Sequence, residues 1–298
     1  MKIKVLILGA NGMLGSSLTR YLSKNKKLSI YACVRNKENA SIFKGVSVED
    51  TIENVDVLDD EALSTLFEMV KPAVVINCVG IIKQVELSKS YTTSIGINSL
   101  YPHRLASICD KYSSRMIHFS TDCVFSGSKG NYLESDFPDS NDLYGQSKLL
   151  GEVTYGNHLT IRTSIIGHEN KSPVSLIDWF LGQKEIKGFS KAIFSGLPTV
   201  CVAEVLEKYF IFDDSIKGLY NLSVDPIDKY SLLKLVSIKY GHRCEIVKDS
   251  NFIINRSLDY SKLSKEVGYK PDNWDTLIQK MHSEYKCYFS TDPGTGDD

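Results

Sequence analysis

Short apolar runs alternate with longer amphipathic stretches through the first 165 residues of the chain. The runs are apolar at nearly every position, which is typical of strands buried on both faces of a parallel sheet. They span residues 4–9, 28–34, 73–80, 115–121 and 158–164. Helical patterns lie between them, including residues 12–23, 59–70 and 98–111. This repetition predicts an α/β fold built on a doubly wound parallel sheet with right-handed crossovers.

The pattern becomes looser after about residue 170. Strand candidates at residues 218–223 and 244–249 alternate with helical candidates at 199–210, 229–241 and 274–285. No linker rich in proline, glycine or serine separates the two parts. We therefore expect a first domain over residues 1–170 and a smaller α/β lobe over residues 171–289 that is interleaved with it. Residues 290–298 are small, acidic and helix-breaking, which predicts a disordered tail.

The charge of the chain is nearly balanced, with 35 lysines and arginines against 36 aspartates and glutamates. Nucleic-acid binding and attachment to a membrane surface need a basic excess, so the balance disfavours both. No apolar run reaches the roughly 18 residues of a membrane-spanning helix, and the first residues turn to glycine too soon for a secretory signal. The 7 cysteines are scattered without metal-ligand spacing. They predict reduced thiols in a cytoplasmic protein and no metal site.

A glycine-rich loop, "LILGANGMLGSSL", separates the first strand from the first helix. Gly9 allows a tight turn, Gly12 lets the backbone approach a pyrophosphate, and Gly15 lets the helix pack closely on the strand. The helix N-terminus then offers free N–H groups to phosphates. The same loop contains Asn11, Met13 and Leu14. A turn without a ligand is the alternative, but the position after the first buried strand favours a Rossmann-like dinucleotide site.

The end of the second strand, "YACVRNKENA", has Arg35 where an NAD site usually has an acidic residue. An arginine there suits a ribose 2′-phosphate, so NADP(H) is favoured. A solvated surface charge is the alternative for Arg35. Asp56 follows a third strand candidate, where its carboxylate is placed to accept a hydrogen bond from the adenine amino group. A helix N-cap is the alternative for Asp56, although Asp59 fits that role better.

Two tyrosines are followed by a lysine at the fourth position, Tyr144 by Lys148 and Tyr230 by Lys234. This spacing brings the two side chains together on a helix, but it occurs in catalytic and ordinary amphipathic helices alike. The surroundings separate the two cases. Tyr144 lies downstream of "FSTD", a Ser-Thr-Asp triplet that ends a strand, whereas Tyr230 lies in an amphipathic stretch of the second lobe. We expect Tyr144 to be catalytic and Tyr230 to be a packing residue.

The glycine loop, the Ser-Thr-Asp triplet and the Y-x-x-x-K pair together resemble an extended short-chain dehydrogenase/reductase. The run "HFSTDCVFSGSKGNYLESDFPDSNDLYGQSKLLGE" is similar to the dTDP-4-dehydrorhamnose reductase branch. Landmarks at residues 161–167, 195–200 and 256–263 extend the resemblance over nearly the whole chain. The stretch "GIIKQ" together with "STDCVFSG" looks closer to the reductase domains of capsule and O-antigen enzymes that make N-acetyl-L-fucosamine. The motifs are highly specific for the family and much less specific for the sugar.

The resemblance implies a reductase that transfers hydride from NADPH to the C4 ketone of a nucleotide-linked 4-keto-6-deoxy sugar, a surface polysaccharide precursor. Tyr144 would donate the proton, and the Lys148 ammonium would lower the pKa of its phenol and bond the nicotinamide ribose. Thr121 would donate a hydrogen bond to the same ketone oxygen. Asn98 matches a position that holds a proton-relaying water. Further cofactor contacts are implied for Val57, Cys78, Val79, Gly80 and Ile165.

The substrate would lie between the two parts of the chain, with the lobe over residues 171–289 as its main binding surface. The side chains implied for it, besides Thr121, are Lys83, Gln84, Cys123 and Arg256. Cys123 stands where related epimerase–reductases keep a cysteine for an epimerisation proton, although a small buried residue is the favoured interpretation. His168, which follows a glycine in a loop, is interpreted as a surface or hydrogen-bonding residue. The oligomeric state, a homodimer among the options, stays open.

Two alternative functions are found on the same fold. Nucleotide-sugar 4,6-dehydratases have Thr-Asp-Glu where this chain has Thr-Asp-Cys at residues 121–123, and they keep NAD bound. The regulatory subunit of methionine adenosyltransferase also resembles this branch and binds NADP without known turnover of a sugar. Retention of Thr121, Tyr144 and Lys148 together favours an enzyme.

Overall fold

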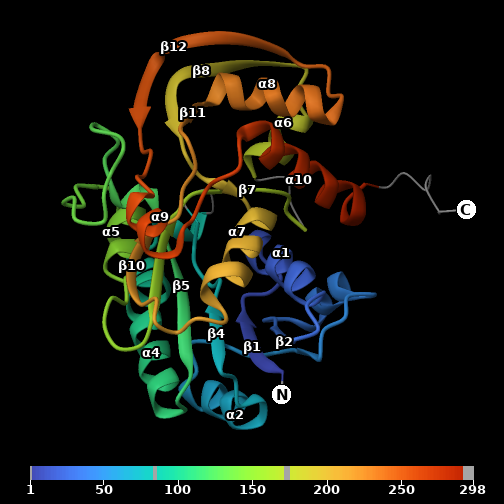
Figure 1. The fold of residues 1–298 in the computed structure, drawn as a ribbon, viewed down its shortest axis with the longest axis vertical. Coiled ribbons are helices and arrows are strands. Elements are labelled where there is room, and N and C mark those ends of the chain that lie inside the picture. The colour runs from blue at the N-terminus through green and yellow to red at the C-terminus, as the bar shows by residue number, and fades with distance from the viewer. Residues whose placement is uncertain (1, 83–85, 171–174, 291–298) are drawn as a thin grey trace, which may run out of the picture.

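The computed structural model describes residues 2–82, 86–170 and 175–290 of the chain. Its centre is a sheet of 7 strands in the order β10-β6-β5-β4-β1-β2-β3 (Figure 1). All neighbouring strands of this sheet run parallel. The strands are β1 (Ile3–Leu8), β2 (Leu28–Cys33), β3 (Asp50–Ile52), β4 (Val74–Asn77), β5 (Arg115–Thr121), β6 (Leu159–Thr163) and β10 (Gly218–Asn221). The predicted doubly wound, Rossmann-like fold is confirmed.

Helices cover both faces of this sheet because its strands are apolar on both sides. Along β1, Val5 and Ile7 face one layer, while Leu6 and Leu8 face the other. The first layer contains α1 (Met13–Leu22) and α7 (Thr199–Val205), which continues as a π-helix over Leu206–Phe210. The second layer contains α2 (Asp60–Val70) and α4 (Tyr101–Lys111).

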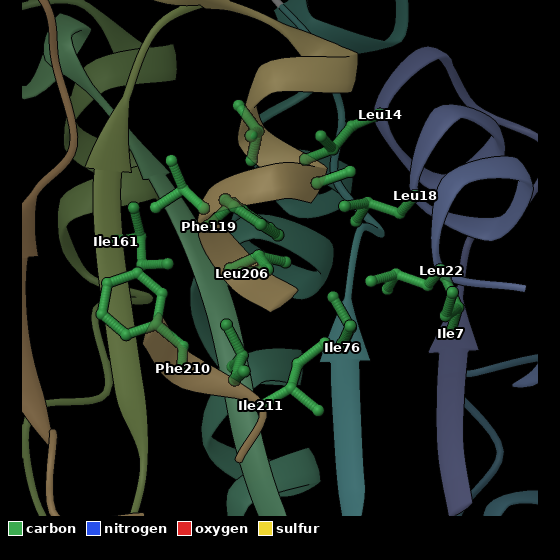
Figure 2. Packing of buried hydrophobic residues seen from close by; sticks show 14 of the residues in the cluster. Ile7, Leu14, Leu18, Leu22, Ile76, Phe119, Ile161, Leu206, Phe210 and Ile211 are labelled. Atoms are coloured by element: carbon green, nitrogen blue, oxygen red, sulfur yellow. The ribbon is translucent and has the colours of Figure 1, made fainter. Parts of the chain in front are cut away.

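The first of these layers joins distant parts of the chain. Figure 2 shows Leu14, Leu18 and Leu22 of α1 beside Leu206, which follows α7. Leu18 and Leu206 are fully buried, and shortening such a leucine to alanine typically costs about 2–5 kcal/mol. Residues 199–221 therefore pack as part of the large sheet's own core, since they supply both this helix and the edge strand β10.

A smaller sheet lies beyond the carboxyl ends of the large sheet's strands (Figure 1). Its 3 strands are in the order β11-β8-β12. They are β8 (Glu185–Phe194), β11 (Ile227–Asp228) and β12 (Glu245–Asn255). The helices α6 (Leu176–Leu181), α8 (Lys229–Tyr240) and α10 (Trp274–Tyr288) share a separate apolar core with it. The predicted strand at 244–249 and helices at 229–241 and 274–285 are present, but β8 was not predicted.

Short elements connect the two sheets around the candidate site. The strand β7 (Ile165–Ile166) pairs with β9 (Leu197–Pro198). In the chain, α3 (Tyr91–Ser94) and a π-helix over Ile95–Leu100 come before β5. The helices α5 (Leu143–Leu149) and α9 (Ser261–Val267) come after it. Across the described ranges, no helix has the length and apolarity needed to span a bilayer. The predicted tail lies almost wholly outside the described residues.

Candidate active site

The candidate site lies at the edge of the large sheet where its parallel strands end. Because β1, β4, β5 and β6 all run in one direction, the residues that follow them meet along this edge. The order of the strands reverses between β1 and β4, and this switch point is where doubly wound sheets bind ligands. The glycine loop, the segment after Asn77 and the turn after Thr121 therefore meet at this edge, where a doubly wound sheet has its binding crevice.

The glycine loop has the geometry that its sequence predicts. Gly9 has a φ of +75°, a left-handed conformation that favours glycine. A Cβ atom added to Gly15 would lie 2.3 Å from the Gly9 carbonyl oxygen, so α1 packs on the turn at a distance only glycine permits. Gly12 would meet only this same oxygen, at 3.5 Å, which leaves open space beside the loop. A phosphate group can therefore approach the backbone here.

The N-terminus of α1 suits a dinucleotide's phosphates. Gly12 is the N-cap and brings no capping side chain, and the first turn carries no acidic residue. The free N–H groups and the positive end of the helix dipole therefore remain available to an anion. Asn170 supports the loop from the side, donating to the Asn11 carbonyl oxygen at 3.1 Å and to the Ser16 hydroxyl at 2.9 Å. Leu14 turns into the core, and Met13 lies beside Gly167.

The residues predicted to select the adenosine half lie on either side of β3. Arg35 is exposed, two residues beyond the end of β2. Asp56 is also exposed, and its carboxylate accepts a hydrogen bond from the Leu58 N–H at 3.0 Å. Val57 is buried beside it. Asp59 caps α2 as predicted, accepting from two N–H groups of the first turn.

The segment after β4 lies between the glycine loop and the catalytic candidates. A Cβ on Gly9 would lie 3.1 Å from the backbone of Cys78 and Val79, so the two segments are in close contact. A Cβ on Gly80 would lie 3.5 Å from Asn98 Oδ1 and 3.9 Å from Lys148 Nζ. Gly80 therefore borders Lys148 directly.

The Asn98 side chain fixes this segment. Its Oδ1 accepts from the Ile81 N–H at 2.9 Å, and its Nδ2 donates to the Ile81 carbonyl oxygen at 3.1 Å and to the Ser147 hydroxyl at 3.3 Å. Asn98 lies in the π-helix over Ile95–Leu100, a kind of irregularity that is frequent at functional sites. The structure thus gives Asn98 a positioning role, while its predicted role in a water relay stays a prediction.

Tyr144 and Thr121 meet at the centre of the crevice. Asp142 caps α5 by accepting from the Gly145 N–H at 2.8 Å, which starts the helix just before Tyr144. A Cβ on Gly145 would lie 2.2 Å from the Cys123 carbonyl oxygen, so this glycine lets α5 approach the end of β5. The Tyr144 phenol is hydrogen-bonded with the Thr121 side chain. The two groups predicted to contact one ketone oxygen are therefore adjacent.

Lys148 follows one helical turn later and is buried. The residue is 6% exposed, and its Nζ donates to the Phe119 carbonyl oxygen at 2.7 Å. Burial lowers the pKa of Lys148 to about 8, although the charge of Glu152 acts in the opposite direction. The ammonium therefore lies within reach of both β5 and Gly80.

The predicted effect of Lys148 on Tyr144 is wrong for this structure. Burial raises the pKa of the Tyr144 phenol, and the nearby Cys123, Asp122 and Asp142 raise it further, while the bond with Thr121 lowers it. The lysine acts on the Phe119 carbonyl instead. The buried environment, which spacing does not reveal, outweighs the neighbouring cation.

A buried ion pair connects the strands next to Thr121 with the segment that follows Lys148. Glu152 accepts from Arg162 Nε and Nη2, each at 2.7 Å, and the two side chains are 6% and 3% exposed. The Ser120 hydroxyl donates to the same carboxylate at 2.7 Å. This network joins β5, β6 and the end of α5. Glu152 was not among the predicted site residues, although its position four residues after Lys148 was a usable signal.

Arg256, which follows β12, contacts the Cys123 side chain in the turn after β5. Arg256 donates from Nη1 to the Cys123 sulfur at 3.5 Å and from Nε to the Phe125 carbonyl oxygen at 2.9 Å. Burial raises the pKa of the Cys123 thiol to about 12. Asp122 is buried between Thr121 and Cys123 and accepts from the Thr121 hydroxyl at 3.2 Å.

The other predicted residues fall in different places. Ile165, in β7, pairs with Leu197 of the neighbouring strand β9. Lys83 and Gln84 lie outside the described residues. His168 is buried, at 3% exposed, and its ring nitrogens bond Asp178 at 2.5 Å and Tyr240 at 2.8 Å, so it is a hydrogen-bonding residue and not a surface one.

The second tyrosine–lysine pair has a different environment. A Cβ on Gly188 would lie 2.8 Å from the Tyr230 ring, so Tyr230 packs tightly against β8. Lys234 lies 5.1 Å above the centre of the same ring. Tyr230 is therefore a packing residue, as predicted.

Comparison with known proteins identifies the family. A family model described as the RmlD substrate binding domain matches residues 2–179. The chain belongs to this family. The predicted resemblance to the dTDP-4-dehydrorhamnose reductase branch is confirmed.

Relatives match the RmlD-family chain over most of its length. The dTDP-4-dehydrorhamnose reductase of Aggregatibacter actinomycetemcomitans is 21% identical over 308 residues, covering 94% of this chain and 98% of that protein. Methionine adenosyltransferase 2 subunit beta of Xenopus laevis is 24% identical over 310 residues, covering 93% and 89%. A dTDP-4-dehydrorhamnose reductase from Bacillus anthracis, solved in complex with NADP, superposes with a TM-score of 0.80 at 18% identity, covering 95% of this chain and 100% of that one. The structural likeness shows a shared fold.

Proposed function

We propose that this protein is a cytoplasmic NADPH-dependent reductase of the C4 ketone of a nucleotide-linked 4-keto-6-deoxy sugar, a precursor of surface polysaccharide. The position of Thr121 beside Tyr144, with Lys148 one helical turn further along α5 and beside Gly80, carries this proposal. Family membership supports it, because full-length relatives include a dTDP-4-dehydrorhamnose reductase. The lobe over residues 171–289 would close the crevice over the sugar.

The catalytic residues divide the work at the ketone oxygen. NADPH, when bound, supplies a hydride for C4. Tyr144 donates its phenolic proton to the C4 oxygen, and Thr121 donates a second hydrogen bond as negative charge develops there. Loss of that proton leaves a phenolate beside the Thr121 side chain, whose hydrogen bond lowers the pKa of Tyr144. Because burial raises the pKa of Tyr144, the phenol stays protonated until its proton is transferred to the ketone oxygen.

The cofactor fits the residues on this edge of the sheet. The uncapped start of α1 and the open space beside Gly12 suit the pyrophosphate. Gly80 brings the segment after β4 beside Lys148, where the nicotinamide ribose would bond the ammonium. Arg35 supports NADP(H) over NAD because a guanidinium binds a 2′-phosphate in a charge-assisted contact.

Two alternatives find less support. An epimerase role for Cys123 needs a thiol that gives up its proton readily, whereas burial raises its pKa to about 12. A regulatory, non-catalytic role is suggested by the methionine adenosyltransferase relative. Such a role does not require Thr121 beside Tyr144 with Lys148 one turn further along the same helix, which is the arrangement here.

NADPH oxidation against a panel of dTDP-, UDP- and GDP-linked 4-keto-6-deoxy sugars tests the proposal. We expect turnover with at least one sugar and a product reduced at C4. NADPH binding without turnover of any panel member would favour the regulatory role instead. Wash-out of the C5 hydrogen into deuterated solvent during turnover would bring Cys123 back as an epimerase residue.

A further inference from the structure

A buried arginine near the end of α1 is incompletely hydrogen-bonded. Arg20 is 4% exposed, and its Nη2 donates to Asn170 Oδ1 at 2.7 Å. Its Nε and Nη1 are also buried, and they form no hydrogen bond within residues 2–82, 86–170 and 175–290. Burying a guanidinium with unpaired N–H groups costs stability, so the presence of this side chain calls for an explanation.

The Asn170 side chain links Arg20 to the glycine loop. Its Nδ2 donates to the Asn11 carbonyl oxygen at 3.1 Å and to the Ser16 hydroxyl at 2.9 Å. Asn11 is the loop residue before the N-cap of α1, and Ser16 lies in the first turn of that helix. The two bonds therefore fix the backbone on either side of the free N–H groups that suit a phosphate. They also keep the Asn11 carbonyl oxygen, a partial negative charge, bound to Asn170.

Arg20 determines which way the Asn170 amide points. The Asn11 carbonyl oxygen needs a donor, which only the Nδ2 end of the amide provides. The guanidinium of Arg20 has donors alone, so it can bind only the Oδ1 end. A flipped amide would place its NH₂ group against the guanidinium and its oxygen against the Asn11 carbonyl oxygen. The arginine thus holds the amide in the one orientation that supports the loop.

The end of α10 holds Arg20 in place. The guanidinium carbon lies 4.8 Å from the centre of the Tyr288 ring and 4.8 Å from that of Phe289, both within cation–π range. Burial lowers the pKa of Arg20, and the Glu284 carboxylate of the same helix acts in the opposite direction. Glu284 also accepts from the Ser17 hydroxyl of α1 at 2.6 Å. Because α10 shares the core of the small sheet, these contacts join the second lobe to the glycine loop.

We propose that Arg20 and Asn170 are positioning residues of the cofactor site, which hold the glycine loop in the conformation that binds the pyrophosphate. Asn170 acts on the loop directly, and Arg20 acts through the Asn170 amide. The inference rests on the dinucleotide site of the proposed reductase and is independent of its sugar substrate. It also makes the end of α10 a support of the cofactor site, although this helix comes last in the chain.

Calorimetric titration with NADP⁺ and with 2′-AMP tests the pair, because 2′-AMP has the adenosine half of the cofactor and lacks the pyrophosphate. Asn170→Asp is nearly isosteric, and its carboxylate accepts from Arg20 but cannot donate to the Asn11 carbonyl oxygen. We expect it to weaken NADP⁺ binding about tenfold or more, without weakening 2′-AMP binding or lowering the thermal unfolding midpoint. Asn157→Asp is the control, the same change at an exposed residue just before β6, at the other end of the strands.

Two variants of Arg20 test its action through the amide. Arg20→Met removes the donor and should reproduce the loss of NADP⁺ affinity, whereas Arg20→Lys keeps a donor and a charge and should restore most of it. A lysine variant no better than the methionine variant would remove Arg20 from the proposal.

The outcomes separate the positioning role from the reductase. Unchanged NADP⁺ affinity in Asn170→Asp would overturn the role, as would an equal loss of NADP⁺ and 2′-AMP binding, which indicates general damage to the site. A selective loss of NADP⁺ binding, in a protein that reduces no keto sugar, would contradict the reductase and leave the positioning residues standing.

Discussion

The Ser120 hydroxyl donates a 2.7 Å hydrogen bond to the Glu152 carboxylate, and this contact joins the strand of Thr121 to the segment that follows Lys148. Arg162 of β6 holds the same carboxylate with two further bonds. The relative position of Thr121 and Lys148 therefore depends on a carboxylate that is hydrogen-bonded to Ser120 and Arg162 and not to either of these two residues. Glu152 is a positioning residue in this arrangement.

Replacing Glu152 with glutamine should damage both stability and cofactor binding. The change leaves Arg162 buried without a counter-charge, which typically costs about 3 kcal/mol or more. It also removes the charge that raises the pKa of Lys148, so this pKa should fall further below about 8. NADPH affinity should then decline at a lower pH than in the wild type. Urea denaturation and a pH series of NADPH dissociation constants measure the two effects.

Asp275→Asn provides the control for this change. It breaks an ion pair with Lys239 at the surface, where the carboxylate side chain is 66% exposed. Exposed pairs of this kind contribute about 0–1 kcal/mol. A loss of stability in Glu152→Gln as small as in the control, with an unshifted pH series, would contradict the positioning role.

Replacing Lys148 with methionine should change how stability depends on pH. The folded-state pKa of about 8 lies below the 10.5 of an exposed lysine, so the unfolded chain binds more protons between these two values. Stability contributed at this site therefore rises with pH across that window and is lowest below pH 8, where the buried ammonium is charged. The gap in unfolding free energy should move by about 3 kcal/mol in favour of the wild type between pH 7.5 and 10.5. Denaturant titrations of both proteins across this range measure it.

A parallel pH dependence in wild type and Lys148→Met would show that the lysine is not desolvated as the structure has it. The same variant should bind NADPH more weakly at neutral pH. NADPH affinity equal to that of the wild type would remove the ribose contact from the proposed mechanism.

Some of this site was predictable from the sequence because local rules specify it. The positions of Gly9 and Gly15 follow from turn geometry and close packing, and the strand pattern alone predicts the sheet edge on which Thr121 lies. The raised pKa of Tyr144 was not predictable, since it depends on how the folded chain buries the phenol.

The strand β8 shows a different limit. Its burial alternates over "EIKGFSKAIF", but two lysines and a glycine within ten residues weaken the apolar signal. Gly188 is needed there because Tyr230 packs against the backbone, a contact that no local rule reveals. The same contact identifies Tyr230 as a packing residue.

Arg35 should determine the choice between the two nicotinamide cofactors. A charge-assisted contact with the 2′-phosphate is worth roughly 1.5–3 kcal/mol, or about 10- to 150-fold in affinity. The wild type should bind NADPH more tightly than NADH by this factor, and Arg35→Ala should bind both alike. Fluorescence titration with each cofactor measures it. Equal affinities in the wild type would rule out Arg35 as the selecting residue.

Tyr144→Phe should abolish most of the turnover while leaving the protein intact. The change removes one hydroxyl and its bond with Thr121, so stability should shift by no more than about 1 kcal/mol. A positioned acid typically contributes about 10²–10⁴-fold, and single-turnover NADPH oxidation with a competent keto sugar should slow by that factor. NADPH affinity should be unchanged, because Lys148 and the glycine loop remain. Tyr230→Phe shares the Y-x-x-x-K spacing but lies against Gly188, so its rate should match the wild type. Full activity in Tyr144→Phe, or a slow rate confined to Tyr230→Phe, would assign the proton to another group.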